Sequence, residues 1–270
     1  MDEGERGDRI EISDIPTEIR ELMLEEQTSM TDIQVLKVIA ESRARVAKAL
    51  KQESKQFHSY LERSDEFLRS HLGTRVRLVI LYADLVRSTH MSMMLPLEKL
   101  TTILQIFAQE MTVVVANNHG YILKYVGDAV IAYFQVDVAA DFNVSSKNAV
   151  SCAMNMLVVV QQGINDVLKE FDFPDLHIKI GIDLGENAII EYGSTETRAH
   201  IDILGYPMNV TAKITLLARP DHILIGDTTY QGLDLRIRER LTKLGLERQD
   251  YIDYRTGDAY IISSFGFDPK

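Results

Sequence analysis

Two aspartates that interrupt strongly apolar runs are the residues best placed for chemistry. Asp84 lies within the run 78–85, and Asp128 lies within 120–134. The β-branched and aromatic residues around both predict strands. A buried carboxylate is costly without a cationic partner, and two held 4 Å apart repel by roughly 4 kcal/mol at an effective dielectric near 20. A divalent cation removes this conflict, and strand-end carboxylates that hold Mg²⁺ beside a phosphate chain serve phosphoryl and nucleotidyl chemistry.

The elements that position these aspartates begin at Arg75, where strand and helix patterns alternate. The pattern favours an α+β sandwich with a mixed sheet of the ferredoxin-like, split βαβ kind. The expected strands are 76–84, a hairpin 121–134 that turns at 126–128, 176–183, a ragged 187–193, a short 200–204, 222–226, and two near 244–252 and 258–265. The expected helices are 96–118, 143–170 and 207–218.

The chain before this domain divides into two parts. Residues 1–16 form an acidic tail with little to bury, which predicts disorder. Residues 17–74 contain no glycine or proline before Gly73, and their apolar residues recur at helical spacing. They predict two or three helices, with Asp32 as a candidate cap. One-sided apolar stripes on these helices require a partner, which is either the domain at 75–270 or another chain.

Bulk composition narrows the class of protein. The 270-residue chain is 46% hydrophobic and 26% charged, which is ordinary for a globular protein. Its net charge of −11 argues against a general nucleic-acid binder and against attraction to an anionic membrane. No apolar run reaches the length of a membrane span, and the N-terminus lacks a secretory pattern. The single cysteine, Cys152, excludes an internal disulfide, so we expect a cytoplasmic protein.

Three ordered segments resemble the motifs of one enzyme family. The run 82–89 (YADLVRST) is similar to the first metal-binding motif of the class III adenylate and guanylate cyclases. The run 119–128 (HGYILKYVGD) resembles their second, and 202–213 (DILGYPMNVTAK) resembles a third, D-x-x-G-x-x-x-N-x-x-x-R. The third departs at its last place, where Lys213 stands for arginine. The resemblance covers roughly residues 75–265 and implies the class III cyclase catalytic domain.

For metals, the resemblance implies that Asp84 and Asp128 bridge two Mg²⁺ or Mn²⁺ ions, with the backbone carbonyl of Leu85 as a further ligand. One ion would activate the ribose 3′-hydroxyl, and the other would hold the triphosphate and offset charge on the pyrophosphate. The backbone amides after the first strand are expected to cradle the triphosphate. They belong to Leu85, Val86, Arg87, Ser88 and Thr89.

Lys124 and Asp202 correspond to the family's base-reading pair. Adenine presents an acceptor at N1 and an amino donor at C6, so an ammonium and a carboxylate match its edge. Guanine presents the reverse pattern. The expected substrate is therefore ATP. A pyrimidine-nucleotide cyclase that acts on UTP or CTP stays open, because sequence does not reveal the depth of the pocket.

The remaining site residues follow from the same resemblance. Asn209 is expected to orient the ribose, and Lys213 to stabilise the pentavalent phosphorus. Arg255 lies where family members often place a triphosphate-binding cation. Arginine offers a planar fork that lysine lacks, and losing a preorganised donor typically costs on the order of 10²–10³ in rate. We therefore expect slow turnover.

In this family the metal aspartates of one protomer face the base-reading and phosphate-binding residues of the other. The chain carries both halves, so the resemblance implies a homodimer that converts ATP to 3′,5′-cyclic AMP and pyrophosphate. The helices of 17–74 are expected to pair across the dimer and to respond to a regulatory partner. The alternative is a low-activity nucleotide-binding regulatory module, which the lysine at position 213 supports.

Overall fold

The computed structural model describes residues 32–51, 61–136, 142–193, 200–244, 257 and 260–266. Its centre is an eight-stranded mixed sheet in the order β2-β3-β1-β4-β6-β8-β7, with β5 paired to β4. The strands are β1 (Arg75–Leu85), β2 (Tyr121–Val126), β3 (Ala129–Gln135), β4 (Ile178–Tyr192), β5 (His200–Leu204), β6 (His222–Gly226), β7 (Thr242–Leu244) and β8 (Ile262–Gly266). This architecture confirms the α+β prediction.

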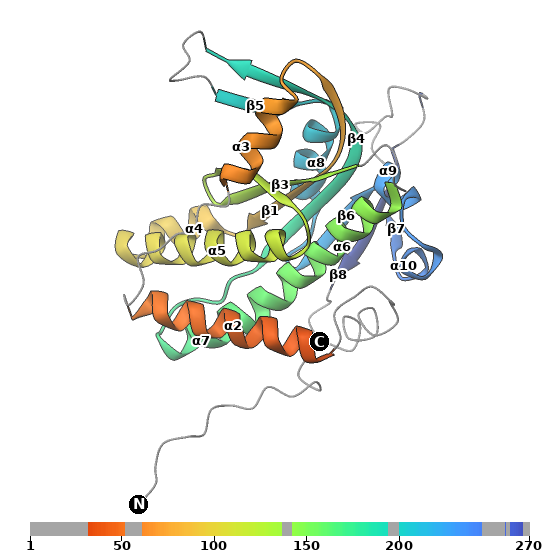
Figure 1. Cartoon of the computed structure of the whole chain (residues 1–270). Coiled ribbons are helices and arrows are strands. Elements are labelled where there is room, and N and C mark those ends of the chain that lie inside the picture. Colours follow the sequence, from red (N-terminus) through yellow and green to blue (C-terminus); the bar gives the residue numbers. More distant parts are fainter. Residues whose placement is uncertain are drawn as a thin grey trace, which may run out of the picture.

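Helices cover both faces of the sheet. The helices are α2 (Asp32–Leu50), α3 (Leu61–Ser70), α4 (Ser88–Met94), α5 (Leu97–Asn117), α6 (Phe142–Val158), the π-helical η2 (Val159–Ile164), α7 (Asn165–Glu170), α8 (Tyr206–Leu217), α9 (Asp227–Gln231) and α10 (Leu235–Glu239). Figure 1 shows α5 and α6 on one face of the sheet and α3 and α8 on the other. The sheet is therefore buried on both sides along much of its length.

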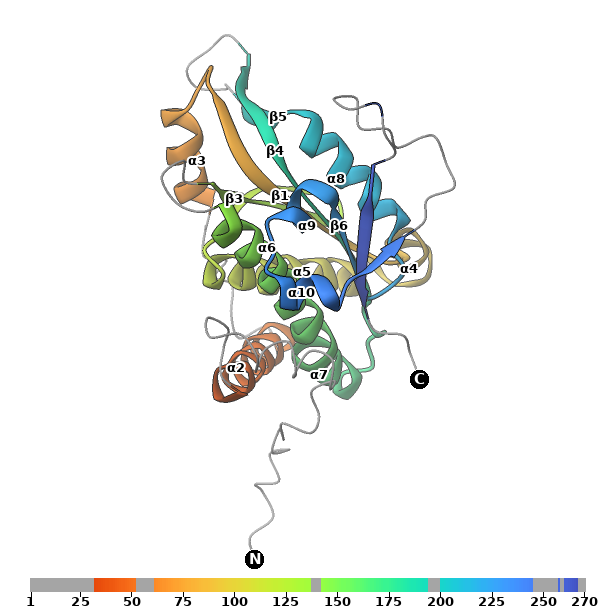
Figure 2. The same cartoon turned by 90° about the vertical axis from the view of Figure 1, so that its right-hand side faces the viewer.

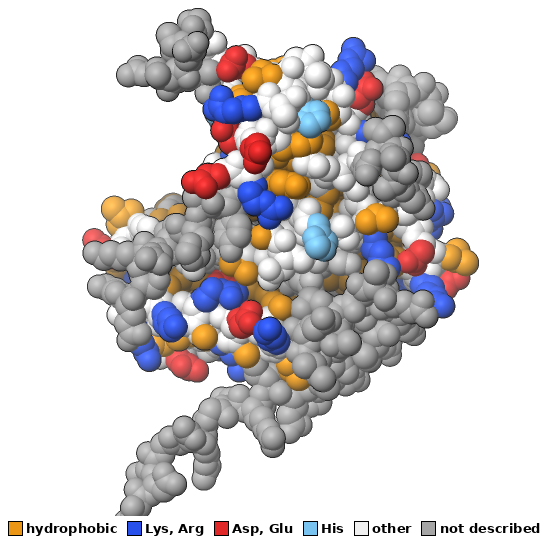
Figure 3. All heavy atoms as spheres, viewed as in Figure 1, with side chains coloured by type: hydrophobic (Ala, Val, Ile, Leu, Met, Phe, Trp, Pro, Cys, Tyr) orange, Lys and Arg blue, Asp and Glu red, His pale blue; other side chains and the backbone are white. Residues whose placement is uncertain are grey.

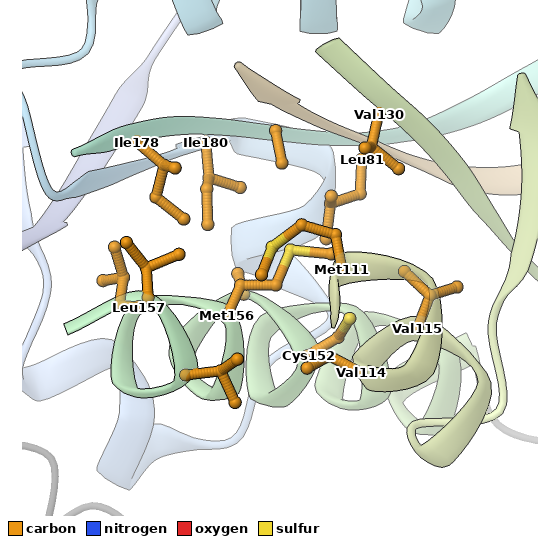
Figure 4. Close-up of a cluster of buried hydrophobic side chains, with 14 of the residues drawn as sticks. Leu81, Met111, Val114, Val115, Val130, Cys152, Met156, Leu157, Ile178 and Ile180 are labelled. Carbon is orange, nitrogen blue, oxygen red and sulfur yellow. The ribbon is translucent and has the colours of Figure 1, made fainter. Parts of the chain in front are cut away.

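The main core lies between the sheet and the α5–α6 layer. Alternate residues of β1, such as Leu81 and Ala83, point into this core, as the two-residue period of a strand requires. They meet fully buried side chains from the two helices, including Met111 and Met156 (Figure 4). Asp84 belongs to the other set of alternate residues and so faces away from this core.

The two described N-terminal helices both pack against the domain that follows them. Val35, Ile39 and Val46 of α2 are buried, and α2 contacts η2 and α7, beside which it lies in Figures 1 and 2. At the other end of the molecule, α3 contacts β2 and β5, and its Ser64 hydroxyl lies 3.0 Å from that of Tyr133. The predicted acidic tail and residues 17–31 lie outside the described residues.

Several elements differ from the sequence prediction. The strands expected at 176–183 and 187–193 form one strand, β4, because pairing with β1 and β5 carries the ladder through Gly185. Gly185 is needed there because a Cβ would lie 2.6 Å from the Pro207 ring. The helix expected at 143–170 contains the π-helical turn η2. The short helices α4, α9 and α10 were not predicted, and most of the strand expected at 244–252 lies outside the described residues.

The surface is of mixed character. On the face seen in Figure 3, acidic and basic side chains are interspersed, and hydrophobic side chains are exposed between them. The part of the chain that the structure describes contains no helix both long and apolar enough to cross a bilayer.

Candidate functional site

The sheet brings the two predicted metal-binding aspartates together. Asp84 is the penultimate residue of β1, where it lies opposite Ala129 of β3. Asp128 immediately precedes Ala129 in the β2–β3 turn, so the two carboxylates lie at adjoining strand ends. Burial raises the pKa of the Asp84 carboxyl, and the nearby charge of Asp128 raises it further. The structure therefore contains the electrostatic conflict that a divalent cation would resolve.

Lys179 is a charged residue of the candidate site that the sequence reasoning missed. It pairs with Asp84 from the opposite strand, β4, and its charge lowers the pKa of Asp84 against the two raising effects. Its Nζ also lies 3.5 Å from the carbonyl oxygen of Leu216 at the end of α8. A lysine inside the apolar run 176–183 is the same kind of anomaly as Asp84 in its own strand, so the same signal could have found it.

The donor set at these strand ends fits a hard divalent cation. Two carboxylates and a backbone carbonyl are all oxygen ligands, which Mg²⁺ and Mn²⁺ prefer. Within the described ranges no group of three or more His, Cys, Asp or Glu side chains could hold a metal by itself. Any ion bound between Asp84 and Asp128 therefore needs further ligands, which the phosphates of a substrate can provide.

The segment after β1 turns sharply into α4. Arg87 adopts a left-handed backbone conformation with φ of 59°, and α4 begins at Ser88. The amide of Val86 donates to the His177 carbonyl at 2.9 Å. Of the five amides predicted to cradle a triphosphate, that of Val86 is thus already engaged, whereas Arg87, Ser88 and Thr89 lie at the start of the helix.

The predicted base-reading residues form a direct ion pair. Lys124 Nζ lies 2.5 Å from Asp202 Oδ2, although the two residues are on separate edges of the sheet, in β2 and β5. Their side chains are 28% and 16% exposed, so the pair is accessible to a ligand. Asp202 also accepts a hydrogen bond from its neighbour, the amide of Ile203, at 2.9 Å.

Tyr82 connects the ion pair to the aspartates. Two residues before Asp84 in β1, it faces the same side of the sheet. Burial raises the pKa of its phenol, and the charge of Asp202 raises it further, which places the two groups near each other. Tyr82 therefore lies on the same sheet face as Asp84 and near Asp202.

Asn209 and Lys213 lie on the outer face of α8. They are one helical turn apart and exposed, whereas Thr211 and Thr215 point toward the sheet and are buried. A Cβ on Gly181 of β4 would lie 2.2 Å from the Thr215 hydroxyl oxygen, which shows how closely α8 packs on the sheet. Asn209 and Lys213 thus face away from the sheet that carries Asp84. Arg255 lies outside the described residues.

Comparisons with known proteins identify the family and the fold of this chain. The family model of the adenylate and guanylate cyclase catalytic domain matches residues 74–255. A cytidylate cyclase of Escherichia coli is 26% identical over 188 residues, which are 65% of this chain and 39% of that protein. Among solved structures, the guanylyl cyclase Cya2 aligns with a TM-score of 0.61 at 23% identity, over 73% of this chain and 96% of its own. The adenylyl cyclase CyaB from P. aeruginosa aligns with a TM-score of 0.59 at 22% identity, over the same shares.

Proposed function

Because the chain belongs to the family of adenylate and guanylate cyclase catalytic domains, we propose that it converts a nucleoside triphosphate to a 3′,5′-cyclic monophosphate and pyrophosphate. The observation that carries this proposal is the meeting of Asp84 and Asp128 at adjoining strand ends, with the pKa of Asp84 raised by burial and by its neighbour. The chain matches only 39% of the length of the cytidylate cyclase to which it is similar. The proposal therefore covers the activity of this chain and carries over nothing from the rest of that longer protein.

In the proposed mechanism, Asp84, Asp128 and the Leu85 carbonyl would hold two Mg²⁺ or Mn²⁺ ions. Ions bound there supply Lewis acidity to the ribose 3′-hydroxyl and charge neutralisation to the departing pyrophosphate. Lys179 favours the ionised form of Asp84, since its charge acts against the rise in pKa that burial and Asp128 cause. Asn209 orients the ribose, and Lys213 places a positive charge at the reacting phosphorus.

The Lys124–Asp202 pair supports a base that carries an amino group beside a ring-nitrogen acceptor. Adenine presents this pattern at C6 and N1, and cytosine presents it at C4 and N3. Guanine and uracil present a carbonyl beside an N–H. Their carbonyl oxygen would face the Asp202 carboxylate, and their N–H would face the Lys124 ammonium. The pair therefore favours ATP, the substrate expected from the sequence, or CTP, and disfavours GTP and UTP.

Two observations favour CTP as the second candidate. The chain is similar to a cytidylate cyclase of Escherichia coli. In addition, Tyr82 lies near Asp202, and we infer that its ring limits the depth available to a base there. A shallow site favours the single ring of cytosine over the two rings of adenine.

The outward direction of Asn209 and Lys213 supports a homodimer. These side chains meet a substrate held at Asp84 and Asp128 when that substrate is bound to a second copy of the chain. Exposed apolar side chains lie beside them on α8: Leu216 is 71% exposed and Leu217 is 42% exposed. Association of two copies would cover this apolar surface and form two equivalent sites.

One assay tests the proposal. The purified chain is incubated with ATP, CTP, GTP or UTP and Mn²⁺, and cyclic product and pyrophosphate are quantified. Cyclic AMP or cyclic CMP that disappears in the Asp84→Asn variant supports the proposal. Triphosphate binding without any cyclic product would instead identify a nucleotide-binding module, the reading that Lys213 supports. Tyr82→Ala should raise the ATP-to-CTP activity ratio, whereas the size-matched Tyr82→Phe should leave it unchanged.

A further inference from the structure

Helix α5 is tied on one side to the N-terminal helix α2. Glu110 of α5 is 1% exposed, and its two carboxylate oxygens accept hydrogen bonds from Arg45 Nε at 2.8 Å and Arg45 Nη2 at 2.7 Å. Such a bidentate contact fixes geometry as well as charge. Figures 1 and 2 show α5 between α2 and the sheet. The position of α5 is therefore coupled to the docking of α2.

On its other side, α5 is tied to the hairpin that presents the candidate site. Thr112 lies two residues after Glu110, about 200° around the helix. Its hydroxyl donates to the Ala108 carbonyl at 2.6 Å, so the 2.7 Å contact between the Thr112 and Tyr125 hydroxyls has the phenol as donor. Thr112 is buried, whereas Tyr125 is 42% exposed, so this hydrogen bond lies at the margin of the core.

Near its turn, the hairpin is also joined to β5 by the Lys124–Asp202 ion pair. Within the described sheet, β2 is an edge strand that pairs with β3 alone, and its register shifts between Ile122 and Lys124. Val126 is 52% exposed, and Gly127 has a φ of 62°. Tyr125 lies between Lys124 and this turn, so its hydroxyl connects the hairpin to α5 close to both Lys124 and Asp128.

We propose that Tyr125 is a positioning residue, and that the docking of α2 controls the site through it. Arg45 holds Glu110, α5 carries Thr112, and Thr112 holds the hairpin that presents Lys124 and Asp128. Undocking of α2 frees α5 to shift, which weakens the hold on Asp128 and on the base-reading lysine together. This inference rests on the proposed cyclase function for its consequences, but the mechanical link can be measured without nucleotide.

The first experiment compares Thr112→Val with Thr112→Ser. Valine keeps the shape of threonine and loses the acceptor, whereas serine keeps the hydroxyl. We expect hydrogen exchange of amides 121–135 to be about fivefold faster in Thr112→Val, and the dissociation constant for Mn²⁺ alone to rise by a similar factor. Thr112→Ser should match the wild type. Tyr125→Phe, which removes only the phenol hydroxyl, should reproduce Thr112→Val, and the double variant should add nothing further.

The second experiment uses a matched pair of neutralised carboxylates. Arg43 of α2 binds Asp166 of α7 and donates to the Gln162 carbonyl at 2.8 Å, so Asp166 anchors α2 without involving α5. Glu110→Gln and Asp166→Asn should both speed exchange in α2. Only Glu110→Gln should also speed exchange in the β2–β3 hairpin.

Equal hairpin exchange in Glu110→Gln and Asp166→Asn, or in Thr112→Val and Thr112→Ser, would overturn the inference. The outcome is separable from that of the proposed function. If the wild type forms no cyclic nucleotide while the hairpin responds as expected, the function fails and the mechanical link stands. If the wild type is active and the hairpin does not respond, the link fails alone.

Discussion

The pair between Arg45 and Glu110 allows a quantitative test of how α2 is held. The Glu110 side chain is 1% exposed and that of Arg45 is 28% exposed. Arg45→Ala would leave a buried carboxylate without this partner, and breaking a buried pair from one side costs about 3–5 kcal/mol. Because Arg45 is partly accessible to water, we expect the lower end, about 3 kcal/mol. For a protein of this size that corresponds to a melting temperature about 6–12 °C below the wild type.

The measurement is thermal unfolding followed by circular dichroism at neutral pH, with two comparison variants. Arg75→Ala removes a pair with Glu186 whose side chains are 78% and 63% exposed, and it should shift the melting temperature by no more than about 2 °C. The double variant Arg45→Met/Glu110→Leu should recover most of the loss, since removing both charges leaves no buried carboxylate. An Arg45→Ala variant that melts within about 2 °C of the wild type would refute the reasoning.

Three further predictions concern the site. Asp84→Asn should abolish cyclisation yet raise the melting temperature of the metal-free protein at neutral pH. Because the folded-state pKa of Asp84 is raised, its contribution to stability is fully present below the unfolded pKa near 3.8 and is lost as the pH rises through the folded pKa. The difference in melting temperature between Asp84→Asn and the wild type should therefore shrink on acidification. Lys213→Arg should raise the cyclisation rate at least about tenfold, because the guanidinium can contact two phosphate oxygens; an unchanged rate would mean a site built around lysine. Gly181→Ala should destabilise the fold by about 1–3 kcal/mol, because its Cβ would lie 2.2 Å from the Thr215 hydroxyl oxygen, and Thr215→Ala should restore part of the loss in a melting experiment.

The meeting of the two aspartates could be predicted because its signal is local. A charged residue in an apolar strand run stands out by itself, and the turn at 126–128 placed Asp128 at a strand end. The antiparallel pairing of β1 and β3 then sets Asp84 opposite Ala129. The spacing of one helical turn predicts that Asn209 and Lys213 share a face of α8, but the sequence alone did not indicate whether that face or the opposite one would pack on the sheet.

The remaining features depend on contacts that leave no periodic pattern. The hydrogen bond between Thr112 and Tyr125 joins two ordinary residues of adjacent elements, and only the packing of α5 on β2 reveals it. The fusion of two expected strands into β4 follows from pairing with neighbours that are distant in sequence. The apolar stripes in the helices of 17–74 predicted that these helices pack against another surface, but not whether that surface belongs to the domain or to another chain. In the described part, α2 and α3 both contact the domain itself.

If Lys124 and Asp202 read the base as proposed, their ion pair would make that recognition selective although the pair is partly exposed. Each side chain already satisfies the other at 2.5 Å, so a base must replace both partners at once when it binds. An amino base does so, because its ring nitrogen accepts from the lysine and its amino group donates to the aspartate. A keto base leaves the aspartate facing a carbonyl oxygen, and sites that must leave a buried polar group unpaired reject a ligand by up to about 10⁴–10⁵. Under the proposed function, discrimination against GTP and UTP would arise because neither base replaces the contact that Asp202 makes with Lys124. Lys124→Met should then reduce this discrimination, because it removes both the donor to the base and the partner with which the base competes.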